Sequence, residues 1–166
     1  MSAALASAIS ATAILPPDRR QSATALHVQR GVRRLYSELG HVTIPEFSLA
    51  NGRRADVIAL CPAGKLTIIE IKSSVADFRA DRKWPDYRNY CDRFYFAIPD
   101  TLSTTLTPED AGLIVADAFG AAILRDPAEH ALSGARRKAV TLRFAHSAAR
   151  LLHALADPGA IREGAL

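Results

Sequence analysis

Two acidic residues and a lysine on neighbouring predicted strands are the part of this 166-residue sequence best suited to chemistry. Apolar residues predict strands over 53–61 and 65–72, and the intervening Pro62-Ala63-Gly64 is typical of a tight turn. We therefore predict a hairpin with a three-residue loop whose glycine adopts the left-handed conformation. This register places Asp56 directly opposite Glu70.

The same register gathers four charged side chains at one end of one face, because Arg54 lies opposite Lys72. Both faces are otherwise largely apolar, which predicts a sheet that is covered on both sides. Opposed carboxylates repel each other, and buried charges are unfavourable unless they are paired or bound to a metal. Diagonal ion pairs, Asp56 with Lys72 and Glu70 with Arg54, would offset the repulsion. A divalent cation between the carboxylates would do the same, and the spacing alone favours neither arrangement.

The elements expected around this hairpin follow from apolar periodicity and from turn residues. They are a helix over 22–40, a strand over 41–49, short helices over 74–81 and 85–91, a strand over 94–98, a helix start at 107–110, a hairpin over 113–124 and a long helix over 135–156. Pro45 places the first strand at an edge or a bend. The order αβββαβ, followed by a hairpin and a helix, predicts an α/β fold with a mixed β-sheet flanked by helices on both faces.

The domain boundaries follow from composition. A hydrophobic content of 49% over 166 residues supports one domain, which we place at residues 21–158. Residues 1–20 lack the basic start and the continuous apolar stretch of an export signal, so we predict a disordered tail there and a C-terminal tail over 159–166. No stretch is long and apolar enough to predict a membrane span.

Composition also limits the classes of function. The 21 basic and 17 acidic residues give a net charge of +4, which permits a polyanionic partner without requiring one. The two cysteines fit neither a disulfide framework nor a metal motif, and they indicate a reducing, cytoplasmic compartment. The sequence has no phosphate-binding glycine loop, no dinucleotide fingerprint and no histidine cluster, so a nucleotide motor, a dinucleotide enzyme and a histidine-based metal site are all disfavoured.

Segment 79–93 mixes basic and aromatic residues. It contains Arg79, Arg82, Lys83, Arg88 and Arg93 together with Trp84, Tyr87 and Tyr90. Cations that meet phosphates and rings that stack on unpaired bases suit nucleic acid, especially single-stranded or branched forms. Three aspartates in the same segment reduce its basic excess, and aromatic residues often pack in a core instead. We expect Lys83 and Tyr87 on one helical face, and we expect Trp84 to pack.

The spacing of the carboxylates and of the lysine resembles a known nuclease motif. Asp56, then thirteen residues, then Glu70-Ile71-Lys72 on adjacent strands is similar to the PD-(D/E)XK superfamily, with Ala55 in place of the proline that names the motif. A longer set of residues resembles the MmcB family of bacterial DNA-repair proteins. That set comprises Pro45-Glu46-Phe47, Arg53-Arg54-Ala55-Asp56, Ile69-Glu70-Ile71-Lys72-Ser73-Ser74, Asp77-Phe78, Asp81, Lys83-Trp84-Pro85-Asp86-Tyr87 and Asp92-Arg93-Phe94-Tyr95-Phe96.

The resemblance implies a restriction-endonuclease-like core and metal-dependent hydrolysis of DNA phosphodiester bonds. Asp56 and Glu70 would bind Mg²⁺ or Mn²⁺ with the backbone carbonyl of Ile71, Glu46 is a candidate for a further carboxylate, and Lys72 would orient the nucleophile or offset charge on the phosphate. The residues expected to contact DNA are Arg54, Arg79, Arg82, Lys83, Tyr87 and Arg88.

Three functions stay open at this point. Retention of Asp56, Glu70 and Lys72 favours the deoxyribonuclease, because a binding surface does not need opposed carboxylates. Members of the superfamily can also serve as catalytically silent DNA-binding or scaffolding modules in repair. A purely structural domain with an ion-pair ladder is the third. Because enzymes that cut both strands often form dimers, a homodimer is compatible with the first.

Overall fold

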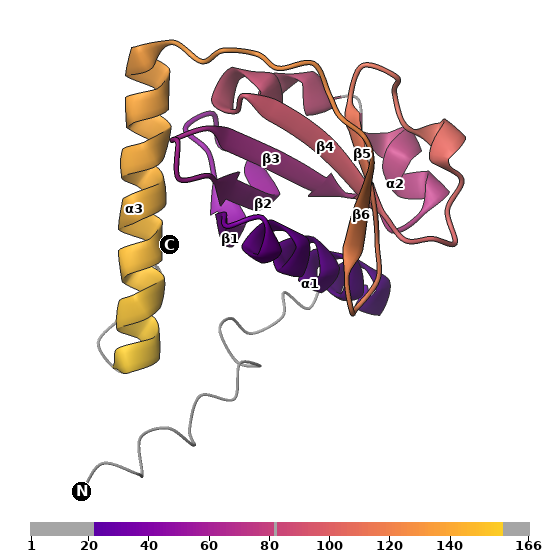
Figure 1. Ribbon diagram of the computed structural model, residues 1–166, viewed down its shortest axis with the longest axis horizontal. Helices are drawn as coiled ribbons and strands as arrows, with labels where there is room; N and C mark the ends of the chain where they lie inside the picture. Colours follow the sequence, from indigo (N-terminus) through magenta and orange to yellow (C-terminus); the bar gives the residue numbers. More distant parts are fainter. Residues whose placement is uncertain (1–21, 82, 158–166) are drawn as a thin grey trace, which may run out of the picture.

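A six-stranded mixed sheet with its strands in chain order forms the centre of the protein (Figure 1). The computed structural model describes residues 22–81 and 83–157. The elements are α1 (Ala23–Glu38), β1 (Val42–Ser48), β2 (Arg54–Leu60), β3 (Leu66–Ile71), α2 (Val75–Ala80), the 3₁₀ helix η1 (Trp84–Tyr90), β4 (Arg93–Ile98), the 3₁₀ helix η2 (Thr104–Leu106), β5 (Gly112–Ala116), β6 (Ala121–Arg125) and α3 (Gly134–Ala156). β3, β4 and β5 run parallel, and the other neighbouring pairs are antiparallel.

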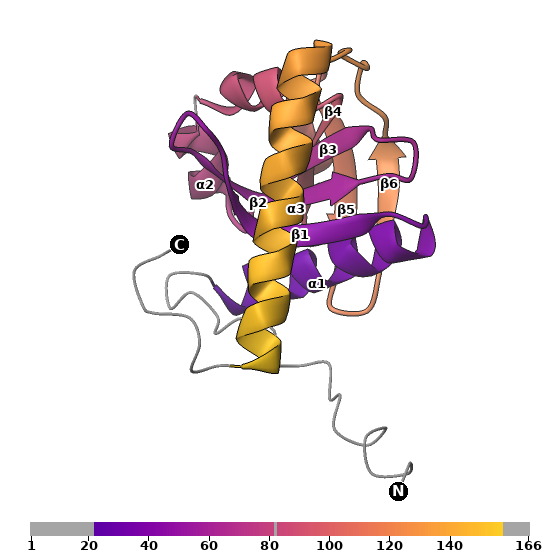
Figure 2. The same ribbon diagram turned by 90° about the vertical axis from the view of Figure 1, so that its left-hand side faces the viewer.

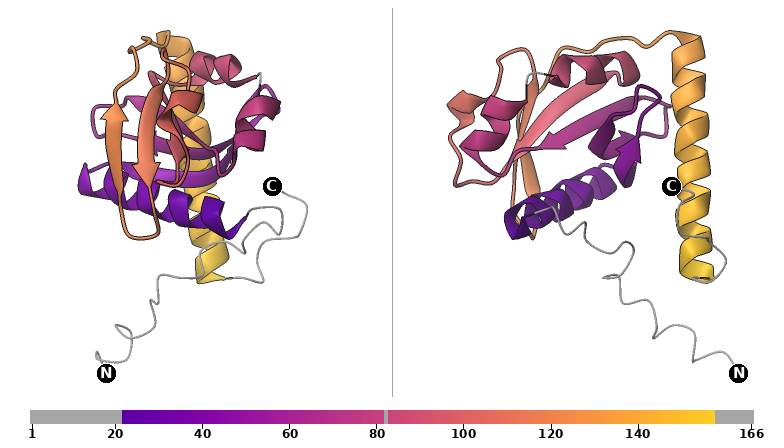
Figure 3. Two further views of the ribbon diagram at one scale, coloured as in Figure 1. Left: turned by 90° about the vertical axis from the view of Figure 1, so that its right-hand side faces the viewer. Right: turned by 180° about the vertical axis from the view of Figure 1, so that it is seen from behind.

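Helices cover both faces of the sheet, so the predicted α/β architecture is confirmed and is consistent with a restriction-endonuclease-like fold. On one face, Val28, Val32 and Tyr36 of α1 pack in a core with β-strand residues such as Ile69. On the other face, Phe144 of α3 joins the core, and side chains of α2 and η1 pack against it. Figure 2 shows α3 crossing in front of β1 and β2, and the left view of Figure 3 shows α1 passing behind the ends of β5 and β6 near their turn.

Gly31 lets α1 approach the turn between β5 and β6. A Cβ atom at this position would lie 2.2 Å from the carbonyl oxygen of Asp117 and 2.3 Å from that of Gly120. No larger residue fits without moving the helix, because real Cβ atoms do not come so close to backbone.

Several local predictions are confirmed. The first helix begins where it was expected, and the Ser22 side chain caps it by accepting a hydrogen bond from the Ala25 amide. Gly64 has a φ of +80°, and Val57 pairs with Ile69, which is the predicted hairpin register. β1 is an edge strand, as Pro45 indicated.

Other local predictions are wrong. Residues 107–110 do not begin a helix, because η2 ends at Leu106 and a turn leads directly into β5. The short helix expected over 85–91 is present, but it is the 3₁₀ helix η1, in which residues three apart share a face. Lys83 and Tyr87, four apart, therefore do not share one: Lys83 is exposed and Tyr87 is buried.

The predicted tails over 1–20 and 159–166 lie outside the described residues, as does Arg82. Within 22–81 and 83–157, no helix is both long and apolar enough to cross a membrane.

The alternation of strand β1 is interrupted at Glu46. Pro45 pairs with Val57 and Phe47 pairs with Ala55, while Glu46 between them adopts a φ of +52°. This left-handed conformation is uncommon for a residue with a side chain, and it turns the strand locally. Ala55 packs in the same core as Ile58 and Phe47, whereas strict alternation from Ile58 would place it on the opposite face of the sheet.

Asp92 connects α3 to the beginning of β3. Its carboxylate is almost fully buried, and it accepts hydrogen bonds from the Leu66 amide at 2.8 Å and from the Leu132 amide at 3.4 Å. The Arg137 guanidinium donates two more, at 2.7 and 2.6 Å. Burial alone would raise the pKa of Asp92, but these donors outweigh it and hold the pKa below its usual value.

We predict that Asp92→Asn lowers the free energy of unfolding by about 2–4 kcal/mol at neutral pH, because Arg137 loses its charged partner. A lowered folded-state pKa stabilises the protein above the unfolded-state pKa, and this stabilisation is lost as the pH falls. In urea denaturation, the difference between wild type and variant should therefore shrink below about pH 4. An equal difference at pH 3 and pH 7 would contradict this role.

Candidate functional site

At one end of the β2–β3 hairpin, hydrogen bonds to the side chains of Asp56 and Glu70 take the place of backbone–backbone hydrogen bonds. The paired register ends at Val57 and Ile69. Beyond it, the Asp56 amide donates to Glu70 Oε1 at 3.2 Å, and the Ile71 amide donates to Asp56 Oδ2 at 2.7 Å. Each carboxylate thus binds the backbone of the opposite strand through one oxygen, and this holds the two side chains together.

Burial makes the two negative charges unfavourable. Glu70 is 6% exposed and Asp56 is half-buried. Burial raises the pKa of Asp56, although the Ile71 amide and the charge of Lys72 oppose this. Burial and then the charge of Asp56 raise the pKa of Glu70 well above its usual value. Without a bound cation, the pair therefore keeps a proton to a higher pH than ordinary carboxyl groups do.

Lys72 lies beside the pair but bonds elsewhere. Its Nζ is 2.5 Å from Asp81 Oδ2 and 5.8 Å from the centre of the Phe96 ring, and the residue is only 7% exposed. The charges of Lys72 and Asp81 both act on Glu70. Three carboxylates and one ammonium therefore lie together, which leaves a formal excess of two negative charges.

Asp81 is a site residue that sequence reasoning missed. It ends α2, and its Oδ1 accepts a hydrogen bond from the Lys83 amide at 3.0 Å. Burial opposes its ionisation, but Lys72 and this amide outweigh burial and lower the pKa of Asp81. In the sequence, Asp81 is only one of three aspartates that lower the net positive charge of segment 79–93. Its contact with Lys72 depends on how α2 returns across the sheet, which no local pattern predicts.

The diagonal ion-pair ladder is not what the structure forms. Arg54 Nε lies 2.6 Å from Glu46 Oε2, and Lys72 pairs with Asp81. The turn at Glu46 explains the difference, because it breaks the alternation that would have placed Arg54 on the face of Glu70.

Glu46 does not join the other two carboxylates. Among the described residues, no three His, Cys, Asp or Glu side chains are placed to share a metal ion. Protein oxygen atoms at the site therefore come from two carboxylates and from the adjacent backbone.

Tyr87 closes the site from the η1 side. Its hydroxyl donates to the Arg54 carbonyl at 3.1 Å, and its ring stacks on Phe94 with a centroid distance of 5.8 Å. Burial and the charges of Glu70 and Asp56 raise the pKa of the phenol. The ring is thus a buried wall beside the carboxylates and is not available to stack on a base.

The other residues expected to contact DNA are dispersed. Trp84 stacks on Phe94, as predicted, and Arg88 lies over the Trp84 ring while it pairs with Asp110 at 2.9 Å. Arg79 lies exposed on α2. Of the predicted contacts, Arg79 and Lys83 are exposed, whereas Arg88 has a protein partner.

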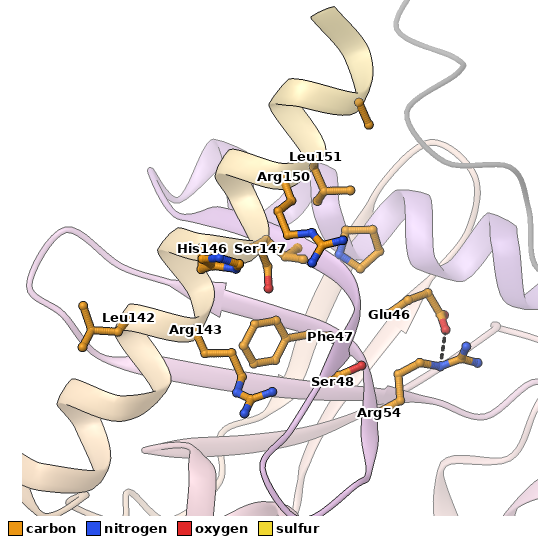
Figure 4. A pocket seen from close by; sticks show the side chains of 13 residues that line it. Glu46, Phe47, Ser48, Arg54, Leu142, Arg143, His146, Ser147, Arg150 and Leu151 are labelled. Atoms are coloured by element: carbon orange, nitrogen blue, oxygen red, sulfur yellow. Dashed lines mark ion pairs between the residues drawn. The ribbon is translucent and has the colours of Figure 1, made fainter. Parts of the chain in front are cut away.

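Two hollows give access to this region from different sides. A cleft of about 530 Å³ contains Asp56 and Ile71 and is bordered by Ser22 of α1 and by Ser73 and Asp77 near α2. A larger groove of about 780 Å³ lies between β1 and α3 and contains Glu46 and Arg54 (Figure 4). Asp56 can therefore be reached by solvent on one side, and Arg54, two residues earlier, borders the groove on the other.

Comparison with known proteins agrees with the fold. The solved structure of a protein of unknown function from Silicibacter pomeroyi matches with 41% sequence identity and a TM-score of 0.83, over 87% of this chain and 99% of that one. No curated protein matches the sequence. The model of the MmcB-like DNA repair protein family matches residues 13–159. The chain therefore belongs to the MmcB-like family of DNA repair proteins.

Proposed function

We propose that this DNA repair protein is a Mg²⁺- or Mn²⁺-dependent deoxyribonuclease whose active site is formed by Asp56, Glu70 and Lys72. The observation that carries the proposal is the charge imbalance of the site. The carboxylates of Asp56, Glu70 and Asp81 carry three formal negative charges, and Lys72 carries one positive charge. The excess of two negative charges equals the charge of one divalent cation. This excess of negative charge does not stabilise the fold, because it makes Asp56 and Glu70 harder to ionise.

The donor set fits such an ion. Mg²⁺ prefers oxygen, keeps several waters, and is commonly held by one or two carboxylates together with substrate phosphate. Asp56 and Glu70, with the carbonyl of Ile71, would supply that partial shell, and the cleft beside Asp56 offers room for water and a phosphate. When bound, the ion would polarise the phosphate and lower the pKa of its water.

The other residues of the site position charge. Lys72 would offset negative charge that develops on the phosphate, because it lies next to both carboxylates. Asp81 holds the Lys72 ammonium at 2.5 Å and so limits where it can lie. The Asp56 and Ile71 amides each fix one carboxylate oxygen, and the Tyr87 hydroxyl also lies within hydrogen-bonding reach of Glu70.

We predict that the wild-type protein with Mn²⁺ cleaves at least one of a set of linear, nicked, flapped and branched DNAs. Asp56→Asn and Lys72→Ala should each lower kcat/KM at least about a hundredfold, because each removes a charge on which the reaction depends. Gel assays with purified variants measure this. Glu129→Gln is the matched control, since that carboxylate pairs with Lys65 and Arg93 at the opposite end of the strands.

Cleavage that persists in the Asp56 and Lys72 variants would identify a contaminant. Tight DNA binding by wild type without any cleavage would overturn the nuclease in favour of the silent DNA-binding module.

Glu70→Gln should stabilise the metal-free protein at alkaline pH. The raised folded-state pKa stabilises the protein only while the carboxyl is protonated, and this is lost as the pH rises through that pKa. In EDTA at pH 8, the variant should therefore exceed wild type by about 0.5–2 kcal/mol in free energy of unfolding, with a smaller gain at pH 5. Urea denaturation at both pH values measures this.

With Mn²⁺, wild type should become more stable than Glu70→Gln, because the ion stabilises only a protein that binds it. Wild type and Glu129→Gln should gain stability with Mn²⁺, and Glu70→Gln should not. A Glu70→Gln variant that is less stable than wild type in EDTA at pH 8 would show that the ionised carboxylate is satisfied without metal.

A further inference from the structure

The helix α3 carries three arginines at a spacing of seven residues: Arg136, Arg143 and Arg150. Seven residues are close to two turns, so these side chains form one stripe with steps of about 10.5 Å. The proposed active site uses none of them. We refer to them as the arginine stripe.

The arginine stripe borders two adjoining hollows. Arg143 and Arg150 line the groove between β1 and α3, and Arg136 and Arg143 line a second hollow of about 530 Å³ near Tyr90. Because Arg143 belongs to both, the hollows continue along one side of α3. Figure 4 shows Arg143 and Arg150 extending from α3 toward the strand that carries Phe47.

Two of these guanidinium groups are available for a ligand. Among the described residues, neither Arg143 nor Arg150 forms an ion pair or a hydrogen bond through its side chain, whereas Arg53, Arg88 and Arg137 all pair with carboxylates. Arg136 donates to the Asn89 carbonyl at 3.2 Å and lies over the Tyr90 ring at 5.1 Å. The acid in the groove, Glu46, is paired with Arg54, so the groove is basic.

The walls of the hollows are apolar. Ile44, Phe47 and Leu151 line the first, and Leu49, Val140 and Tyr90 line the second. The outside of a duplex offers phosphates but no base surface to a recessed apolar wall. A single strand offers both phosphates for the arginines and unstacked bases for the walls.

We infer that the arginine stripe and its two hollows bind single-stranded DNA and lead it toward the carboxylate site. The inference rests on the proposed function, since it names the part of the substrate that this surface holds. Arg54 lines the groove and precedes Asp56 by two residues, so the groove ends close to the carboxylate site. A substrate with a single-stranded flank beside the scissile bond uses both surfaces at once.

Binding without metal tests the inference separately from cleavage. Fluorescence anisotropy in EDTA would compare a labelled 20-nucleotide single strand with a duplex of the same sequence over a range of KCl concentrations. The variants are Arg143→Ala/Arg150→Ala and, as the matched control, Lys138→Ala. Lys138 is exposed on the same helix, about 200° around its axis from Arg136.

Wild type should bind the single strand more tightly than the duplex. The double variant should lose at least about tenfold in affinity and reduce the slope of log K against log salt by about 1.4, which is about 0.7 for each phosphate contact. Lys138→Ala should change the affinity less than threefold. Circular dichroism confirms that each variant is folded.

Equal binding by the double variant and by wild type would overturn the inference, as would preference for duplex or an equal loss in Lys138→Ala. None of these outcomes bears on the nuclease, which fails instead if wild type with Mn²⁺ cleaves no DNA.

Discussion

The opposition of two carboxylates across the β2–β3 hairpin is the interaction on which the site depends. Asp56 and Glu70 repel each other in a poorly solvated place, yet each accepts a hydrogen bond from the backbone of the opposite strand. These two bonds hold the charges together at the point where the ladder ends. The two carboxylates therefore repel each other at close range, and a cation bound between them would remove this repulsion.

The rest of the fold gives the two nearby cations, Arg54 and Lys72, other ion-pair partners. The left-handed backbone at Glu46 directs Arg54 toward the β1–α3 groove, and the end of α2 brings Asp81 to Lys72. At the other end of the same strands, the buried Asp92 pairs with Arg137 and so attaches α3 to the sheet. α3 can then present its arginine stripe along the groove while the sheet end stays free to form the carboxylate site.

Much of this arrangement could be predicted from the sequence because it depends on local chemistry. A glycine suited to the left-handed turn sets the hairpin register, and that register alone places Asp56 opposite Glu70. Apolar periodicity and turn residues locate α1 and α3. The helices on both faces follow from strands that are apolar on both sides.

The partners of the charged side chains could not be predicted in the same way. Strict alternation predicts Arg54 beside Glu70. The left-handed backbone at Glu46 interrupts the alternation, and Arg54 pairs with Glu46 instead. The Lys72–Asp81 pair depends on a helix of six residues and on its exit angle. The role of Tyr87 depended on whether its segment is α or 3₁₀, since the two differ in which spacing shares a face.

The central claim is that Asp56 and Glu70 hold a divalent cation, and anomalous diffraction from crystals soaked in Mn²⁺ tests it most directly. The account predicts one strong peak about 2.0–2.3 Å from an oxygen of each carboxylate, with the Ile71 carbonyl nearby. A map without a peak between the two carboxylates would contradict it.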